Sequence, residues 1–172
     1  MHFNLEKDVS TTVSIIIGSE SDLDLANKCS ATLDSLSITN SIQVLSAHRT
    51  PDLLENHVRE CESGGTKVFV AMAGLAAHLA GAVASKTVLP VIGVPGDGGP
   101  LSGMDALLST VQMPKGIPVA TVAIGSAGAV NSAYLSAQIL GVESEEIRNS
   151  LLKVRADGKE AIKESNKKLL NS

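Results

Sequence analysis

The feature that most constrains this chain is the regular alternation of short apolar runs with longer segments of helical pattern. The runs are rich in aliphatic residues and occupy residues 13–17, 42–45, 68–71, 91–94 and 119–124. Each connection between successive runs is long enough to hold a helix, which parallel strands require and antiparallel hairpins do not. The sequence therefore predicts the α/β class: a single three-layer α/β/α domain with a doubly wound parallel sheet of about five strands.

The composition agrees with a buried parallel sheet. Aromatic residues make up only 2% of the 172 residues, so aliphatic side chains must fill the core, as they do in sheets covered by helices on both faces. Few rings also speak against a base-stacking surface for nucleic acid, and a net charge of −4 speaks against binding to a phosphate backbone. We therefore expect no nucleic-acid partner.

The cysteines and the N-terminus predict a cytoplasmic protein. Cys29 and Cys61 form no metal-binding or redox motif, and Cys29 falls in helical register with Leu25 and Leu33. We expect Cys29 to be a buried thiol in a reducing compartment. Residues 1–12 lack the apolar stretch of a signal peptide, and no run is long enough to cross a bilayer.

The principal candidate for chemistry is Ser-Ala-His-Arg-Thr-Pro at residues 46–51, directly after the second predicted strand. Thr50 and Pro51 are favoured at the start of a helix, here predicted to end at Ser63. The turn would hold His48 and Arg49 at the carboxyl edge of the sheet, where open α/β proteins bind ligands. Imidazole transfers protons near neutral pH and guanidinium binds phosphate. From these residues alone, an exposed loop without a role explains the pair equally well.

Three further segments could contribute to a binding site. Residues 18–22 (Gly-Ser-Glu-Ser-Asp) open a helix whose free N–H groups favour an anion, although a capped helix is the simpler explanation. Residues 73–81 are small and surround His78, for which a structural role is slightly favoured over acid–base work. Residues 96–100 have the composition of a mobile loop or lid. His57, inside the second predicted helix, is expected at the solvated surface.

Taken together, these motifs closely resemble the PurE family of purine biosynthesis. Its members are carboxyaminoimidazole ribonucleotide mutases and related aminoimidazole ribonucleotide carboxylases. The matching segments follow the family's order and are residues 18–22, 46–51, 73–79, 90–95, 101–105, 111–114 and 119–125. Several independent motifs in one order are more specific than any one of them.

The resemblance implies a flavodoxin-like fold and an octamer of identical chains with active sites at subunit junctions. We expect residues 1–11 to be a lead-in segment, residues 12–141 to form the PurE-like domain, and residues 142–172 to form a C-terminal helix that packs on a neighbouring subunit. The charges on this helix predict ion pairs four residues apart, such as Glu164 with Lys168.

By resemblance, the chain moves a carboxylate from the exocyclic nitrogen of an aminoimidazole ribonucleotide to a ring carbon, by decarboxylation to bound CO₂ and recarboxylation. The resemblance makes His48 the general acid–base and His78 the second active-site histidine. It implies no metal and no cofactor. The substrate-binding residues that it implies are Ser19, Ser21, Asp22, Ser46, Ala47, Arg49, Gly74, Ala76, Ala77 and Leu79.

The His-Arg-Thr-Pro form resembles the mutase class, because the direct carboxylases typically carry lysine at the position of Arg49. Direct carboxylation by CO₂ and a non-catalytic nucleotide-binding module are the alternatives. Ala80 replaces the family's usual proline, which predicts a looser turn beside His78. Asp97 adds a carboxylate near an anionic substrate. The implied partners are the ribonucleotide and an ATP-dependent carboxyaminoimidazole ribonucleotide synthetase that hands over its product.

Overall fold

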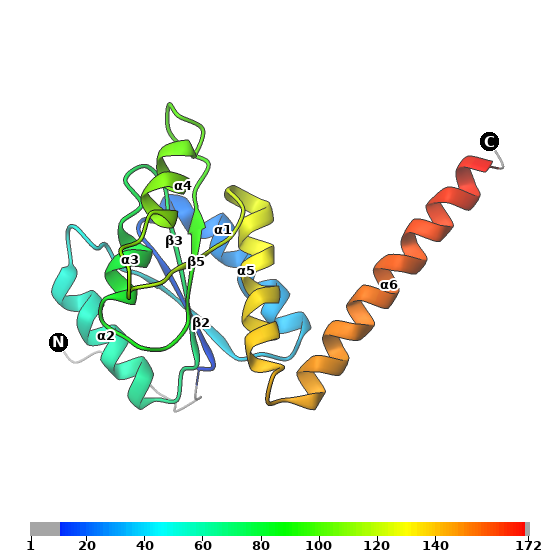
Figure 1. Ribbon diagram of the computed structural model, residues 1–172, viewed down its shortest axis with the longest axis horizontal. Coiled ribbons are helices and arrows are strands. Elements are labelled where there is room, and N and C mark those ends of the chain that lie inside the picture. The colour runs from blue at the N-terminus through cyan, green and yellow to red at the C-terminus, as the bar shows by residue number, and fades with distance from the viewer. Residues whose placement is uncertain (1–10, 171–172) are drawn as a thin grey trace.

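Five parallel strands run through the centre of the molecule in the order β2-β1-β3-β4-β5 (Figure 1). Their bounds are β1 Val13–Ile17, β2 Asn40–Val44, β3 Val68–Ala73, β4 Val91–Pro95 and β5 Ala120–Thr121. This order, with every pair parallel, is that of flavodoxin-like folds and confirms the predicted class. The computed structural model describes residues 11–170, so the expected lead-in lies, apart from Thr11, outside the described residues.

Helices cover both faces of the sheet. One face carries α1 and α5, and the other carries α2, α3 and α4, while α6 leaves the body as a straight helix (Figure 1). A short 3-10 turn, η1, precedes α1. The bounds are η1 Glu20–Asp22, α1 Leu23–Ser35, α2 Pro51–Ser63, α3 Leu79–Ala84, α4 Met104–Val111, α5 Gly125–Leu140 and α6 Glu145–Leu170.

Strand β1 is buried along its whole length because it packs on both helical layers. Ile15 and Ile17 point to the α1/α5 face, where Cys29 is fully buried as predicted. Ile16 points to the opposite face and meets Leu54 of α2. Such two-sided burial holds the carboxyl end of β1 in a fixed place, and the residues that follow it belong to the site described below.

Several predicted elements differ from the observed ones. Strand β2 begins at Asn40, two residues before the predicted run, and β5 is only two residues long. Helix α3 was not predicted, because six residues with Gly81 among them show no clear helical period. Ala80 lies buried in the first turn of this helix, a position where proline is also tolerated, rather than in a loose turn.

Helix α6 has no buried residue, and only its base touches the body of the molecule through the half-buried Ile147 and Leu151. The predicted four-residue spacing of ion pairs on this helix occurs between Lys153 and Asp157 at 2.5 Å. The pair given as an example is wrong, because Glu164 pairs with Lys167 at 2.6 Å, three residues away, rather than with Lys168. Within residues 11–170, no helix combines the length and the apolar character that spanning a membrane requires.

Candidate active site

A cavity of about 790 Å³ opens at the carboxyl edge of the sheet, around the ends of β1, β2 and β3. The chain passes from β1 outward to β2 and then returns to β3 on the other side of β1, so β1 and β3 flank the switch point of this topology. Open α/β folds bind ligands at such a point. All the predicted site residues except Ala77 line this cavity. The side chain of Ala77 is buried, and its N–H donates to Ser109 Oγ at 3.0 Å.

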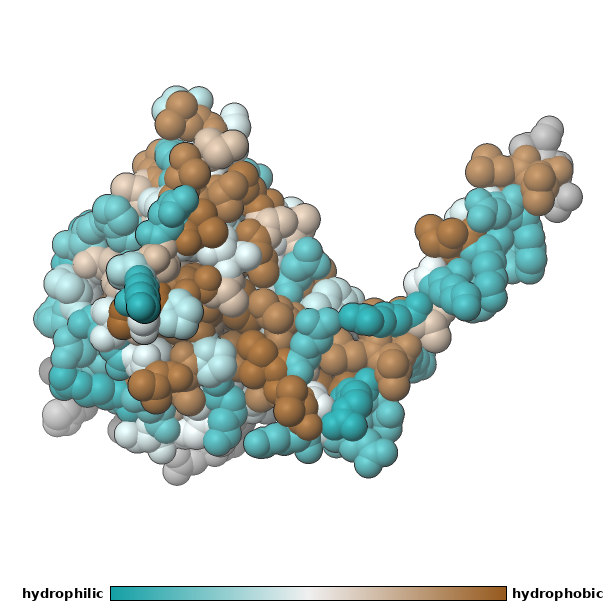
Figure 2. All heavy atoms as spheres, in the orientation of Figure 1, coloured by the Kyte–Doolittle hydropathy of each residue, from teal (hydrophilic) through white to brown (hydrophobic). Residues whose placement is uncertain are grey.

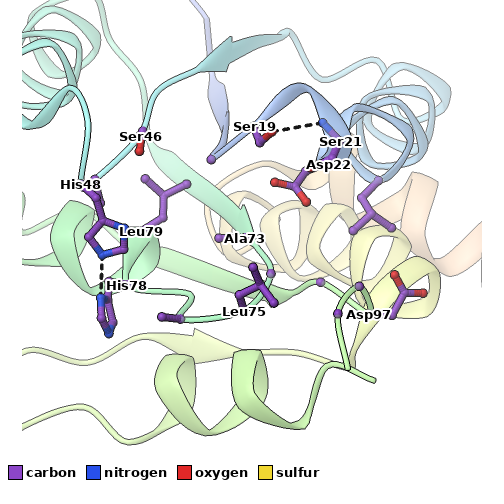
Figure 3. Close-up of a pocket in the computed structure, with 18 of the residues that line it drawn as sticks. Ser19, Ser21, Asp22, Ser46, His48, Ala73, Leu75, His78, Leu79 and Asp97 are labelled. Carbon is purple, nitrogen blue, oxygen red and sulfur yellow. Dashed lines mark hydrogen bonds between the residues drawn. The ribbon is translucent and has the colours of Figure 1, made fainter. Parts of the chain in front are cut away.

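Two exposed histidines from different turns meet at the mouth of the cavity (Figure 3). His48 follows β2, and His78 occupies the N-cap position of α3. His48 Nε2 and His78 Nδ1 are 2.7 Å apart, with the rings edge to face at 83°. One of these nitrogens carries the hydrogen and the other accepts it. The pair can therefore hold a proton and pass it on.

Thr50 explains why the turn before α2 is well defined. It occupies the N-cap position as predicted, but its hydroxyl makes no bond to the helix. Instead Thr50 Oγ1 accepts a hydrogen bond from the Ser46 N–H at 3.0 Å and donates to the Ser46 carbonyl at 3.2 Å. These bonds close the loop that carries His48 and Arg49, so both side chains project from a fixed backbone.

Arg49 connects two turns of the site. Its Nη2 donates to the Gly18 carbonyl at 3.1 Å, and its Nε donates to Ser46 Oγ at 3.3 Å. A guanidinium has five N–H donors in a planar fork, more than these contacts use. The contact with Gly18 places the cation beside Ser19 in the β1–α1 turn, where its unused donors are suited to bind a phosphate or carboxylate.

The β1–α1 turn contributes a hydroxyl and a carboxylate. Ser19 caps η1, and its Oγ accepts a hydrogen bond from the Ser21 N–H at 3.4 Å. Asp22 lies at the start of α1 with its carboxylate toward the cavity (Figure 3). Burial raises the pKa of this carboxyl, and a hydrogen bond from the Ser19 backbone partly offsets the rise. Asp22 can accept hydrogen bonds from sugar hydroxyls.

Sequence reasoning missed several residues of the cavity wall. Lys28 and Asp24 form an ion pair of 2.6 Å on the exposed side of α1, and Ser126 lies in the first turn of α5. All three line the cavity together with Leu75. The four-residue spacing of opposite charges could have suggested the ion pair of Asp24 with Lys28. No sequence signal indicates that the start of α5, with Ser126, lies at this edge of the sheet. Among the described residues, no group of three or more His, Cys, Asp or Glu side chains could hold a metal ion.

His57 does not join the site, and the prediction of a solvated surface position is wrong. Its ring is half-buried, with Nε2 2.9 Å from Ser14 Oγ and 3.4 Å from Cys61 Sγ. Ser14 lies near the amino end of β1, whereas His48 and His78 follow the carboxyl ends of β2 and β3. Burial lowers the pKa of His57.

The fold and the cavity define a class: a flavodoxin-like α/β protein whose cavity at the switch point of the sheet holds two histidines in contact and an arginine. The model of the AIR carboxylase family matches residues 12–161, and the chain belongs to this family. The match covers all the strands and the five helices of the body.

Named relatives and solved structures agree. The chain is 50% identical to the N5-carboxyaminoimidazole ribonucleotide mutase of Pseudomonas aeruginosa, over 90% of this chain and 94% of the relative. It is 47% identical to the mutase of the same name from Bacillus subtilis, over 92% and 98% of the two chains. The crystal structure of Treponema denticola PurE superposes with a TM-score of 0.84 at 29% identity, covering 91% of this chain and 97% of that one.

Proposed function

We propose that this chain catalyses the reaction for which its relatives are named, the N5-carboxyaminoimidazole ribonucleotide mutase reaction of purine (IMP) biosynthesis. It is an isomerase reaction in which the carboxylate moves from the exocyclic nitrogen to a ring carbon. The observation that carries the proposal is the contact of His48 with His78 at 2.7 Å in a cavity that also holds Arg49. Proton transfer and anion binding, the two tasks of this reaction, thereby meet in one place.

The proposed chemistry needs two proton transfers that cancel. First the bond between nitrogen and the carboxylate carbon breaks, CO₂ forms, and the exocyclic nitrogen takes up a proton. Then the ring carbon attacks CO₂ and loses its own proton. A single imidazole can give the first proton and take the second, because its pKa lies near neutral pH. We assign this role to His48, with His78 holding its ring in place and sharing the proton.

The remaining cavity residues hold the ribonucleotide. Arg49 and Ser19 bind its phosphate, since the Arg49 guanidinium reaches from the β2–α2 turn to the β1–α1 turn that holds Ser19, where an anion also meets helix N–H groups. Asp22 accepts hydrogen bonds from the ribose hydroxyls. Ala77 contributes through the backbone of its turn only, because its side chain is buried. The other contacts come from Ser21, Ser46, Ala47, Gly74, Ala76 and Leu79.

The proposal includes a homo-octamer whose subunits cover α6. In proteins, most of the stability of a helix comes from packing of its apolar face against other elements. Helix α6 instead exposes apolar side chains to solvent, and Figure 2 shows these hydrophobic residues in brown along the projecting helix. Helix α4, together with a residue two positions before its cap Gly103, exposes a second apolar stripe, made of Leu101, Met104, Leu108 and Val111. Light scattering should give the mass of eight chains, and a monomeric mass would contradict this part of the proposal.

The proposed mutase reaction also suggests where the enzyme works in the cell. We place the enzyme in the cytoplasm, where it receives carboxyaminoimidazole ribonucleotide from an ATP-dependent synthetase. It needs no cofactor for the chemistry proposed above, because every step is a proton transfer or a carbon–nitrogen or carbon–carbon bond change that the histidines can assist.

A turnover assay with two substrates side by side tests the function. One sample holds carboxyaminoimidazole ribonucleotide without ATP or bicarbonate, and the other holds aminoimidazole ribonucleotide with high bicarbonate. Efficient formation of the carbon-carboxylated product only in the first sample supports the mutase. Efficient formation only in the second makes the chain a direct carboxylase, and ligand binding without turnover in either makes it a nucleotide-binding module.

A further inference from the structure

Asp97 lies in a glycine-rich stretch, residues 96–99, that rests directly on the turn between β3 and α3. The Gly96 N–H donates to the Ala73 carbonyl at 2.8 Å. A Cβ placed on Gly96 would lie 3.1 Å from Gly74 Cα, and one on Gly99 would lie 2.5 Å from Leu75 Cδ2. The glycines therefore permit close packing at these points, and the stretch forms one wall of the cavity.

On its other side, Asp97 touches the beginning of α5. Gly125, the first residue of this helix, has a φ of +68°, and a Cβ placed on it would lie 2.7 Å from Asp97 Oδ2. The preceding Ile124 is the N-cap residue and makes no side-chain bond to the helix. The carboxylate thus occupies the positive end of a 16-residue helix that lacks a polar cap of its own.

This contact accounts for a negative charge beside an anionic substrate. A helix N-terminus favours a negative charge beside it, and the Asp97 side chain lies apart from the histidine pair, on the far side of the cavity (Figure 3). In this position Asp97 joins the wall of residues 96–99 to α5, while Gly96 joins the same wall to the turn that leads to His78.

We propose that Asp97 is a positioning residue that holds this wall in place at the side of the cavity, so that CO₂ is retained between the two halves of the reaction. The inference rests on the proposed function. Breaking the nitrogen–carbon bond yields CO₂ and aminoimidazole ribonucleotide, and forming the carbon–carbon bond consumes both and releases the ring proton. A wall that opens between these steps lets CO₂ escape and leaves aminoimidazole ribonucleotide as the product.

The test compares Asp97→Asn and Asp97→Ala with the native chain, each supplied with carboxyaminoimidazole ribonucleotide and no bicarbonate. The readout is the ratio of aminoimidazole ribonucleotide to carbon-carboxylated product, after subtraction of uncatalysed loss. Asp52→Asn is the matched control, because Asp52 is an exposed carboxylate in the first turn of α2 outside the cavity lining. Thermal unfolding verifies that each variant is folded, and Asn keeps the size of the native side chain.

We expect the ratio to rise about tenfold in Asp97→Ala, less in Asp97→Asn, and not at all in the control. Added bicarbonate should restore the carbon-carboxylated product, since external CO₂ replaces what escapes. An unchanged ratio in both variants overturns the inference, even where the overall rate falls, because the residue then acts on chemistry or stability alone. A native chain that forms neither product from this substrate contradicts the proposed function instead.

Discussion

Within residues 11–170, two clusters of polar side chains that contain histidine lie toward opposite ends of the same sheet, and their surroundings differ. At the carboxyl edge, His48 and His78 are exposed, bond to each other, and line a cavity of about 790 Å³. Toward the amino edge, the half-buried His57 contacts Ser14 and Cys61. The pair of His48 and His78 is open to a ligand, whereas His57 provides a hydrogen-bond partner for the buried hydroxyl of Ser14 inside an apolar layer.

The comparison teaches that residue type alone does not reveal a reactive site. A cysteine, a histidine and a serine in contact have the composition of a nucleophilic centre, yet burial raises the pKa of the Cys61 thiol and lowers that of His57. Both shifts favour the neutral forms, the opposite of what a thiolate–imidazolium pair requires. Hydrogen bonds from Ser14 and Thr66 offset the shift of Cys61 only in part.

The largest effect should come from His48→Asn. Asn keeps a polar group of moderate size but cannot transfer protons, so we expect turnover to fall about 100-fold or more while stability is unchanged. Calorimetric titration with aminoimidazole ribonucleotide in the absence of bicarbonate should show affinity close to native. If turnover survives at the native rate, the acid–base assignment is wrong and the two clusters no longer differ in the proposed way.

An intermediate effect is expected from the second cluster, on stability only. His57→Ala should lower the free energy of unfolding by about 1–3 kcal/mol, because it leaves the buried Ser14 hydroxyl without this partner. Combining Ser14→Ala with His57→Leu removes both polar groups and should cost less than the sum of the two single changes. Urea unfolding measures the native chain, His57→Ala, the two single changes of the pair and the double change.

Turnover per folded molecule provides the control for these changes at Ser14 and His57. It should stay native in every variant of Ser14 and His57, because neither residue lines the cavity. A variant that folds and loses turnover would show that the second cluster contributes to function, and the comparison would fail.

The smallest effect should appear in the pH dependence of stability. Burial lowers the pKa of His57 below its ordinary value of 6.5, so on acidification the unfolded chain takes up a proton before the folded one does. The contribution of His57 to stability is thus fully present above 6.5 and is lost as the pH falls through the folded pKa. Between about pH 7.5 and about pH 5.5, His57→Leu should lose less stability than the native chain. Equal losses would contradict the assigned pKa direction.

The number and order along the chain of the strands, the start of α2 and the family followed from local patterns. Apolar runs such as residues 68–71 are separated by segments of helical length, and Pro51 after Thr50 fixes the start of α2. These signals are local because each depends on backbone geometry or on the burial of neighbouring residues. Helix α3 escaped prediction because a six-residue helix is too short to display a period.

The sequence by itself thus determined which turns follow which strands, and that His48, Arg49 and His78 lie in such turns. Only the tertiary structure decided that these turns meet. Strand β1 lies between β2 and β3, so the turns that carry His48 and His78 reach each other across the end of β1. It also decided that His57 faces inward and that Asp97 reaches α5. Such contacts join residues far apart in the chain, and they depend on strand order and helix packing, which no local pattern encodes.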